Sequence, residues 1–140
     1  MNAPLYTLEI LRLAASLPEP AKLERMSGSA ELRSPTCGSV VHTEVRLKNG
    51  RIEALSQQVQ ACAFGQASAA LVGNYATGQS RDSLAVALDQ LTAWLSGETD
   101  RVPDWAGLQA LAPARSHRSR HGAILLPFRA LLAAIDSVAD

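Results

Sequence analysis

The chain has 140 residues, of which 47% are hydrophobic and 19% are charged, and its formal net charge is zero. This length and composition fit one globular domain over residues 1–140 and do not fit a disordered chain. The zero net charge argues against nucleic acid as the main partner, and no apolar run approaches the roughly 20 residues of a membrane-spanning helix.

The N-terminal half predicts one helix followed by a small antiparallel sheet. Apolar residues recur every three or four positions from about Leu5 to Leu17, which indicates a helix that the two following prolines end. Alternating apolar residues over 40–47 predict a strand, and Asn49-Gly50 predicts a type I′ turn with positive φ at both positions. The chain would return over 51–59, and residues 30–34 could supply a third strand.

The C-terminal half predicts a series of helices. An Ala-rich helix is expected over 63–74, and Ser80 is a good N-cap for a second helix that Gly97 ends. A short helix or turn follows over 105–111. The last helix covers 124–135 and contains Pro127, which marks either its start or a bend. The whole predicts an α+β fold: an N-terminal helix, a three-stranded antiparallel sheet, then packed C-terminal helices.

The two cysteines are the first candidates for chemistry. The sequence opens without the basic and apolar regions of a secretory signal, so we expect a cytoplasmic protein whose Cys37 and Cys62 are reduced thiols. Cys37 lies in a predicted turn, where Gly38 leaves room for a metal or a partner to approach. Cys62 lies where a strand ends and a helix begins, and the positive potential of a helix N-terminus favours thiolate, the form that binds metal. The alternative is that each is a small buried apolar residue.

Three histidines and a basic segment complete the candidates. His121 could be a third metal ligand as a neutral imidazole, or it could be an ordinary helix-end residue. We expect His42 on the solvent side of the sheet and His117 within the basic segment from Arg115 to Arg120. That segment is either a docking surface or merely a solvated patch. A hydrolase built from a cysteine and a histidine has no further motif to support it.

In this order along the chain, these features resemble the NifU/IscU-type scaffolds of iron–sulfur cluster assembly. The most specific parts are Cys37-Gly38 and the segment from Cys62 to Ser68, CAFGQAS. The resemblance implies a fold like the IscU/NifU N-terminal domain, in which three cysteines meet at one exposed end. There they accept sulfur from a cysteine desulfurase, combine it with iron and pass a [2Fe–2S] cluster to acceptor proteins. Many members of the family also bind zinc.

Two residues depart from the family pattern: Ser39 replaces an aspartate, and Gly122, after His121, replaces the third cysteine. We therefore predict no catalytic residue, Cys37 and Cys62 as the cofactor-binding residues, and Cys37, Cys62 and His121 as ligands of a cluster, iron or zinc. A missing ligand would come from a partner or a second copy, which leaves a homo-oligomer open.

The predicted function is a cluster assembly scaffold or a sulfur and iron carrier, not an enzyme. Its expected partners are a cysteine desulfurase and acceptor apo-proteins. The alternative is a degenerate family member that carries no cluster, binds zinc or partners, and regulates a cysteine desulfurase.

Overall fold

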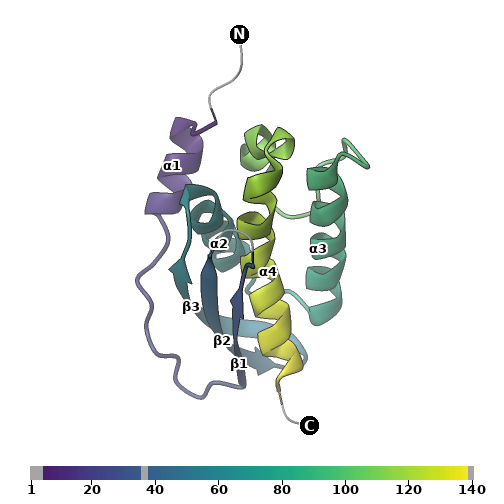
Figure 1. Cartoon of the computed structure of the whole chain (residues 1–140). Helices are drawn as coiled ribbons and strands as arrows, with labels where there is room; N and C mark the ends of the chain where they lie inside the picture. The colour runs from purple at the N-terminus through teal and green to yellow at the C-terminus, as the bar shows by residue number, and fades with distance from the viewer. Residues whose placement is uncertain (1–4, 36–37, 139–140) are drawn as a thin grey trace.

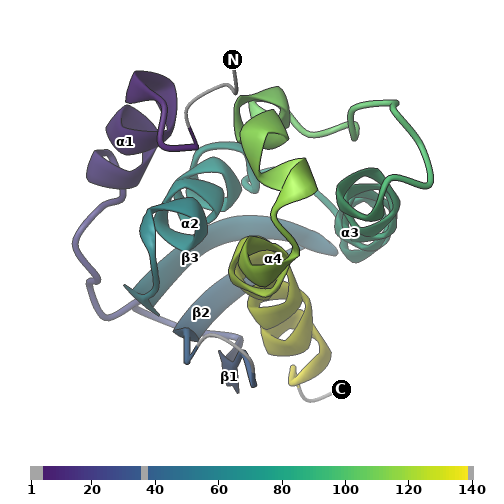
Figure 2. The same ribbon diagram turned by 45° about the horizontal axis from the view of Figure 1, so that its top comes forward.

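The computed structural model describes residues 5–35 and 38–138 and places a sheet under a layer of helices (Figure 1). Helices α2 and α4 cover one face of the sheet, α1 packs on α2, and α3 packs on α4 (Figures 1 and 2). The elements in chain order are α1 (Leu8–Ala15), β1 (Gly28–Arg33), β2 (Val40–Lys48), β3 (Arg51–Gln60), α2 (Ala63–Tyr75), α3 (Arg81–Ser96), the 3₁₀ helices η1 (Leu108–Ser116) and η2 (Arg118–Arg120), and α4 (His121–Asp136). The predicted α+β fold is confirmed.

Helix α1 is shorter than the apolar pattern predicted. It begins after Thr7, whose hydroxyl accepts a hydrogen bond from the Ile10 N–H at 3.1 Å. It ends at Ser16, whose hydroxyl donates to the Leu13 carbonyl at 2.6 Å. Short polar side chains that bond the backbone favour helix ends over helix interiors, so they set the limits here. The apolar residues beyond these caps lie outside the helix.

The sheet is antiparallel in the order β1-β2-β3. The predicted turn between β2 and β3 is confirmed, with φ of 53° at Asn49 and 75° at Gly50. Strand β1 begins two residues earlier than expected, at Gly28. A Cβ on Gly28 would overlap the Ala134 carbonyl and would lie 2.6 Å from the Ser137 hydroxyl, so the glycine allows β1 to pass close under α4. Sequence periodicity alone does not reveal such a contact.

A buried polar pair lies between the sheet and α2. Thr43 and Gln57 face each other across β2 and β3, and they are 0% and 8% exposed. The Gln57 amide donates to the Ala69 carbonyl at 2.9 Å, which ties β3 to α2. Within the described part of the chain, the Thr43 hydroxyl and the other amide atom of Gln57, Oε1, have no hydrogen-bond partner. Each such atom costs about 1–3 kcal/mol when buried.

Small residues let α2 and α4 approach closely. A Cβ on Gly65 would lie 3.3 Å from the Ala123 carbonyl, and the Ser68 hydroxyl donates to the Ile124 carbonyl at 2.6 Å. Pro127 neither starts α4 nor ends it, because the helix begins at His121 and runs through the proline. Pro127 has no N–H to offer the Ala123 carbonyl. The close contact with α2 holds this part of α4 in place.

Helix α3 has the ends that the sequence predicted. Ser80 and Ser83 form a reciprocal capping box at its start, and Gly97 ends it with φ of 86°. Between α3 and η1 in the sequence lies Trp105, whose ring is buried against Phe128. The indole N–H of Trp105 donates to the Leu71 carbonyl at 3.0 Å. No helix in the described ranges has the length and apolar character needed to cross a bilayer.

An exposed ion pair joins the start of α3 to the end of α4. Arg81 donates two hydrogen bonds to Asp136, at 2.5 and 3.0 Å, and this hydrogen bonding lowers the pKa of the Asp136 carboxyl below its ordinary 3.8. A lowered folded-state pKa stabilises the fold above the ordinary pKa, and the contribution is lost as the pH falls through the folded-state value.

We therefore expect Asp136→Asn to lower the free energy of unfolding slightly at pH 7, because exposed ion pairs contribute little. Urea denaturation at a series of pH values checks this. The difference between the variant and the wild type should shrink at pH values well below 3.8. A difference that stays constant over this range would contradict a role for the carboxylate charge.

Candidate functional site

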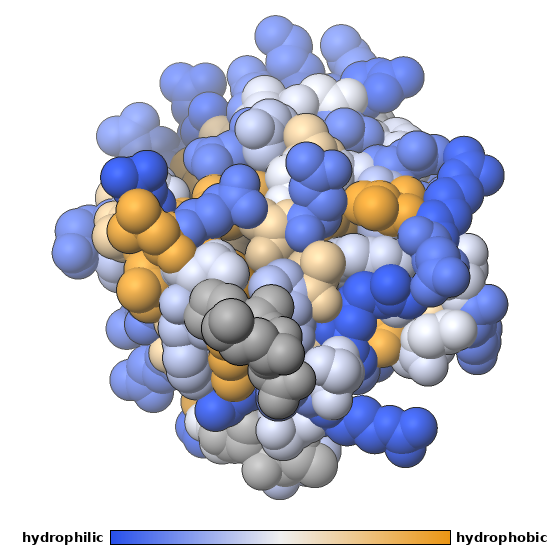
Figure 3. All heavy atoms as spheres, turned by 90° about the horizontal axis from the view of Figure 1, so that it is seen from above, coloured by the Kyte–Doolittle hydropathy of each residue, from blue (hydrophilic) through white to orange (hydrophobic). Residues whose placement is uncertain are grey.

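A surface hollow of about 290 Å³ lies where three distant segments meet. The segments are the turn before β2, the junction of β3 and α2, and η2 just before α4. The lining residues are Gly38, Ser39, Gln60, Ala61, Cys62, Ser119 and Arg120. Figure 3 views the molecule from above with respect to Figure 1, and this face mixes hydrophilic side chains with separate hydrophobic areas.

Cys62 lines this hollow, and it lies between a strand and a helix as predicted. It is the N-cap residue of α2, with an extended backbone at φ −66° and ψ 174°. Its thiol is free and half-buried, and its side chain makes no capping hydrogen bond. The Cys62 carbonyl accepts from the Gln66 N–H at 3.0 Å, which begins the helix. The thiol can therefore react without breaking a helix cap.

Cys37 lies outside the described residues, so its role as a ligand stays a prediction. The residues beside it form a closed turn, in which the Ser34 N–H bonds the Ser39 carbonyl at 2.8 Å and the Gly38 N–H bonds the Ser34 carbonyl at 3.2 Å. Gly38 has φ of 72°, a conformation that favours glycine. Gly38, the residue after Cys37 in the sequence, lines the same hollow as Cys62.

His121 is the first residue of α4 and does not line the hollow. Its Nε2 lies 2.9 Å from the Ala114 carbonyl and 3.1 Å from the Arg115 carbonyl. Both carbonyls only accept hydrogen bonds, so Nε2 carries the hydrogen and Nδ1 is the atom with a lone pair for a metal. The structure places His121 next to a residue of the hollow, Arg120, and its role as a ligand stays a prediction.

The donors of the hollow fit a soft metal cargo only in part. Thiolate is the ligand that iron–sulfur clusters and zinc prefer, and Cys62 supplies it. In the described ranges, no three His, Cys, Asp or Glu side chains gather as a metal site. A tetrahedral metal held here would need ligands beyond those that the described residues place together.

The arginines of the basic segment from Arg115 to Arg120, which covers the end of η1 and all of η2, have different surroundings. Arg115 is used internally: it donates to the Trp94 and Thr99 carbonyls at 2.8 and 2.9 Å, and its guanidinium lies 5.2 Å from the Trp94 ring centre. Arg118 is exposed, and Arg120 is half-buried at the hollow. The idea of one continuous docking patch from Arg115 to Arg120 therefore does not hold for Arg115.

The other histidines lie away from the hollow. His42 is on the outer face of the sheet as expected, with its Nε2 3.7 Å from a Glu44 carboxylate oxygen. His117 is exposed, as expected for a member of the basic segment, and its Nδ1 lies 3.2 Å from the Pro113 carbonyl.

Sequence reasoning missed an aromatic contact beside the hollow. The Arg120 guanidinium lies 5.9 Å from the Tyr6 ring centre, and that ring lies 5.2 Å from the ring of Phe64. Phe64 is 0% exposed, so this chain of contacts links the hollow to the core. Nothing in the spacing of these three residues indicates the contact, because they come from three separate segments.

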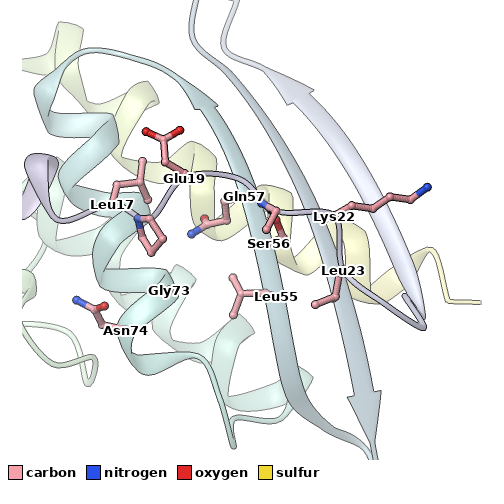
Figure 4. A pocket seen from close by; sticks show the side chains of 11 residues that line it. Leu17, Glu19, Lys22, Leu23, Leu55, Ser56, Gln57, Gly73 and Asn74 are labelled. Carbon is pink, nitrogen blue, oxygen red and sulfur yellow. Dashed lines mark hydrogen bonds between the residues drawn. The ribbon is translucent and has the colours of Figure 1, made fainter.

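A second cavity of about 300 Å³ lies between α2, β3 and the segment that joins α1 to β1 (Figure 4). Leu17, Leu55 and Gln57 are among its walls, and Figure 4 shows carbon, nitrogen and oxygen atoms but no sulfur in the side chains that line it. No described residue that lines it is a cysteine or a histidine. Its described lining therefore offers no thiolate or imidazole to a soft metal or sulfur cargo.

The chain is an α+β domain with a NifU/IscU-like fold, and it has a thiol at the junction of its third strand and second helix. The structure of the N-terminal part of a nitrogen-fixing NifU-like protein from Brucella abortus matches this chain with a TM-score of 0.89 and 27% identity, over 95% of this chain and 93% of that one. The resemblance to NifU/IscU-type proteins is thereby confirmed.

A second solved structure has the same fold. It is a protein from the thermophile Fervidobacterium islandicum AW-1, assigned as an iron–sulfur cluster assembly scaffold for the SUF system. The TM-score is 0.83 and the identity 16%, over 94% of this chain and 96% of that one. No family model matches the chain, and no curated protein matches it in sequence.

Proposed function

We propose that this protein is an iron–sulfur cluster assembly scaffold, or a sulfur and iron carrier, that holds its cargo at the hollow around Cys62. The observation that carries the proposal is the position of Cys62, a free and half-buried thiol at the start of α2. The proposal is supported by the fold, which the chain shares with a NifU-like protein at a TM-score of 0.89. The protein binds and passes on its cargo and is not an enzyme.

The proposed ligands are Cys37, Cys62 and His121, and the cargo is a [2Fe–2S] cluster or iron, with zinc as an alternative. Cys37 precedes Gly38, a residue of the hollow, and His121 follows Arg120, another residue of the hollow. His121 would bind through Nδ1, because Nε2 donates to backbone carbonyls. The remaining ligand would come from a partner or from a second copy of the chain.

The proposed partners are a cysteine desulfurase, which supplies sulfur, and the apo-proteins that accept the cargo in the cytoplasm. Arg118 is exposed at the rim of this end of the molecule and is available to contact them. Arg115 is not, because its guanidinium is bonded to the end of α3.

A second candidate function is a family member that carries no cluster, binds zinc or partners, and regulates a desulfurase. The observation that favours it is the sparse donor set, since no three potential metal ligands gather in the described ranges. Ser39 and Gly122 also lack the donor atoms that the family pattern has at these positions.

Anaerobic reconstitution with iron and sulfide, followed by visible absorption and metal analysis, tests the proposal. We expect the wild type to bind iron and sulfide stoichiometrically and Cys62→Ser to lose at least about nine tenths of both, because a thiolate ligand is removed. Cys37→Ser and His121→Ala should also lose cargo. His42→Ala is the matched control, because His42 lies on the outer face of the sheet.

The scaffold proposal would be overturned if the wild type bound no stoichiometric iron, or if Cys62→Ser bound as much iron as the wild type. Binding of zinc alone, lost in Cys62→Ser, would favour the second candidate function.

A further inference from the structure

We propose that Arg120 makes the hollow selective for anionic sulfur, so that the species delivered to Cys62 is the persulfide anion of a donor. This inference rests on the proposed function, since it concerns the same hollow. It assigns a role to a residue that the family pattern does not mark.

The described lining of the hollow is positively charged. Of the seven residues that line it, Arg120 is the charged one, and no described lining residue is acidic. Ser39, where the family pattern has an aspartate, is only 4% exposed and uncharged. The backbone N–H groups at the start of α2 add positive potential beside Cys62. The positive charge around Cys62 therefore favours an anionic sulfur donor over a neutral one.

The Arg120 side chain contacts an aromatic ring that packs on the core. Its guanidinium lies over the Tyr6 ring, and Tyr6 in turn packs on the buried Phe64. A cation above an aromatic face is stabilised there, and a half-buried charge is screened less by solvent than an exposed one. Arg118, two residues earlier, is exposed. Arg120 is thus the arginine of this segment that both lines the hollow and has its guanidinium beside an aromatic ring.

The chemistry of sulfur transfer shows why such a charge matters. The Cys62 sulfur attacks the terminal sulfur of the donor persulfide anion, R–S–S⁻. A new S–S bond forms at Cys62, the S–S bond of the donor breaks, and the Cys62 thiol proton ends on the released donor thiol, R–SH. No net oxidation or reduction occurs. The negative charge moves from the donor persulfide to the new Cys62 persulfide, and Arg120 is the cationic residue of the hollow that can pair with it.

A pair of alkylating reagents tests this charge selectivity without any metal. In the Cys37→Ser background, Cys62 is the one cysteine left in the chain. We expect the ratio of its alkylation rate with anionic iodoacetate to that with neutral iodoacetamide to exceed the ratio for N-acetylcysteine. Arg120→Gln should lower the ratio about threefold or more, since one nearby charge is removed.

Two matched variants sharpen the result. Arg120→Lys should keep most of the ratio, because it keeps the charge, and Arg118→Gln should leave the ratio unchanged. Both reagents attack the same thiolate, so a change in the exposure or ionisation of the thiol cancels in the ratio. A merely structural role of Arg120 would alter both rates alike.

A ratio that Arg120→Gln leaves unchanged, or a wild-type ratio no higher than that of N-acetylcysteine, would overturn the inference. Its failure is distinct from failure of the proposed function. Cluster reconstitution in a protein without charge selectivity overturns this inference alone, whereas charge selectivity in a protein that binds no iron overturns the scaffold proposal alone.

Discussion

Gly65→Leu is expected to lower the free energy of unfolding by about 3 kcal/mol or more, the upper part of the range for overpacked cores. Even the first side-chain atom has no room, because a Cβ on Gly65 would lie 2.5 Å from the Ala61 Cβ and 3.3 Å from the Ala123 carbonyl. Neither atom belongs to a flexible side chain. The substitution should therefore push α2 away from α4, and urea denaturation followed by circular dichroism would measure the loss.

Alanine substitutions at two glycines of the same helix provide the matched comparison. Both gain helix propensity of roughly 0.5–1 kcal/mol. At Gly73 the nearest atom to an added Cβ is the Gln57 amide nitrogen at 3.3 Å, which a side chain can shift. Gly73→Ala should therefore be neutral or stabilising, whereas Gly65→Ala should destabilise. Equal effects at the two positions would contradict the steric account.

Gly122→Cys is expected to raise the affinity for zinc at least about tenfold, or roughly 1.4 kcal/mol. Gly122 is the second residue of α4, next to His121 and two positions after Arg120 of the hollow. A cysteine there supplies the thiolate that the family pattern has at this position, and a third thiolate suits both zinc and an iron–sulfur cluster. Competition with a chromogenic chelator measures the affinity.

The control for this prediction adds a cysteine elsewhere. Ser96 is exposed at the end of α3 and does not line the hollow, so Ser96→Cys should leave the zinc affinity of the site unchanged. If Gly122→Cys binds zinc no better than Ser96→Cys, position 122 does not face the cargo. Ser39→Asp is a poorer route to the same end, because a carboxylate would replace a side chain that is only 4% exposed.

Much of the fold could be predicted from local sequence chemistry. The turn at Asn49-Gly50, the cap at Ser80 and the stop at Gly97 depend on the backbone preferences of single residues, and all three are confirmed. The start of β1 at Gly28 and the passage of α4 through Pro127 were not predicted. Both depend on contacts with a distant element, which periodicity within one segment does not reveal.

At the site, too, local features could be predicted from the sequence, and contacts between distant segments could not. The place of Cys62 between a strand and a helix follows from local patterns. The role of Arg115 does not, because residues that adjoin in sequence point to different neighbours once η1 and η2 turn the chain. The contact of Arg120 with Tyr6 was not predicted for the same reason, since a ring contact across so many residues has no local signature.

The contact between Arg115 and Trp94 has a consequence for the tryptophan fluorescence of the protein. Trp94 and Trp105, the two tryptophans of the chain, are both buried, and neither lines the hollow. Their fluorescence therefore reports on the packing of α3 and η1 against the rest of the core, and the thiol of Cys62 reports on the hollow. Emission and thiol labelling together separate a local opening of the cargo site from the loss of the whole fold.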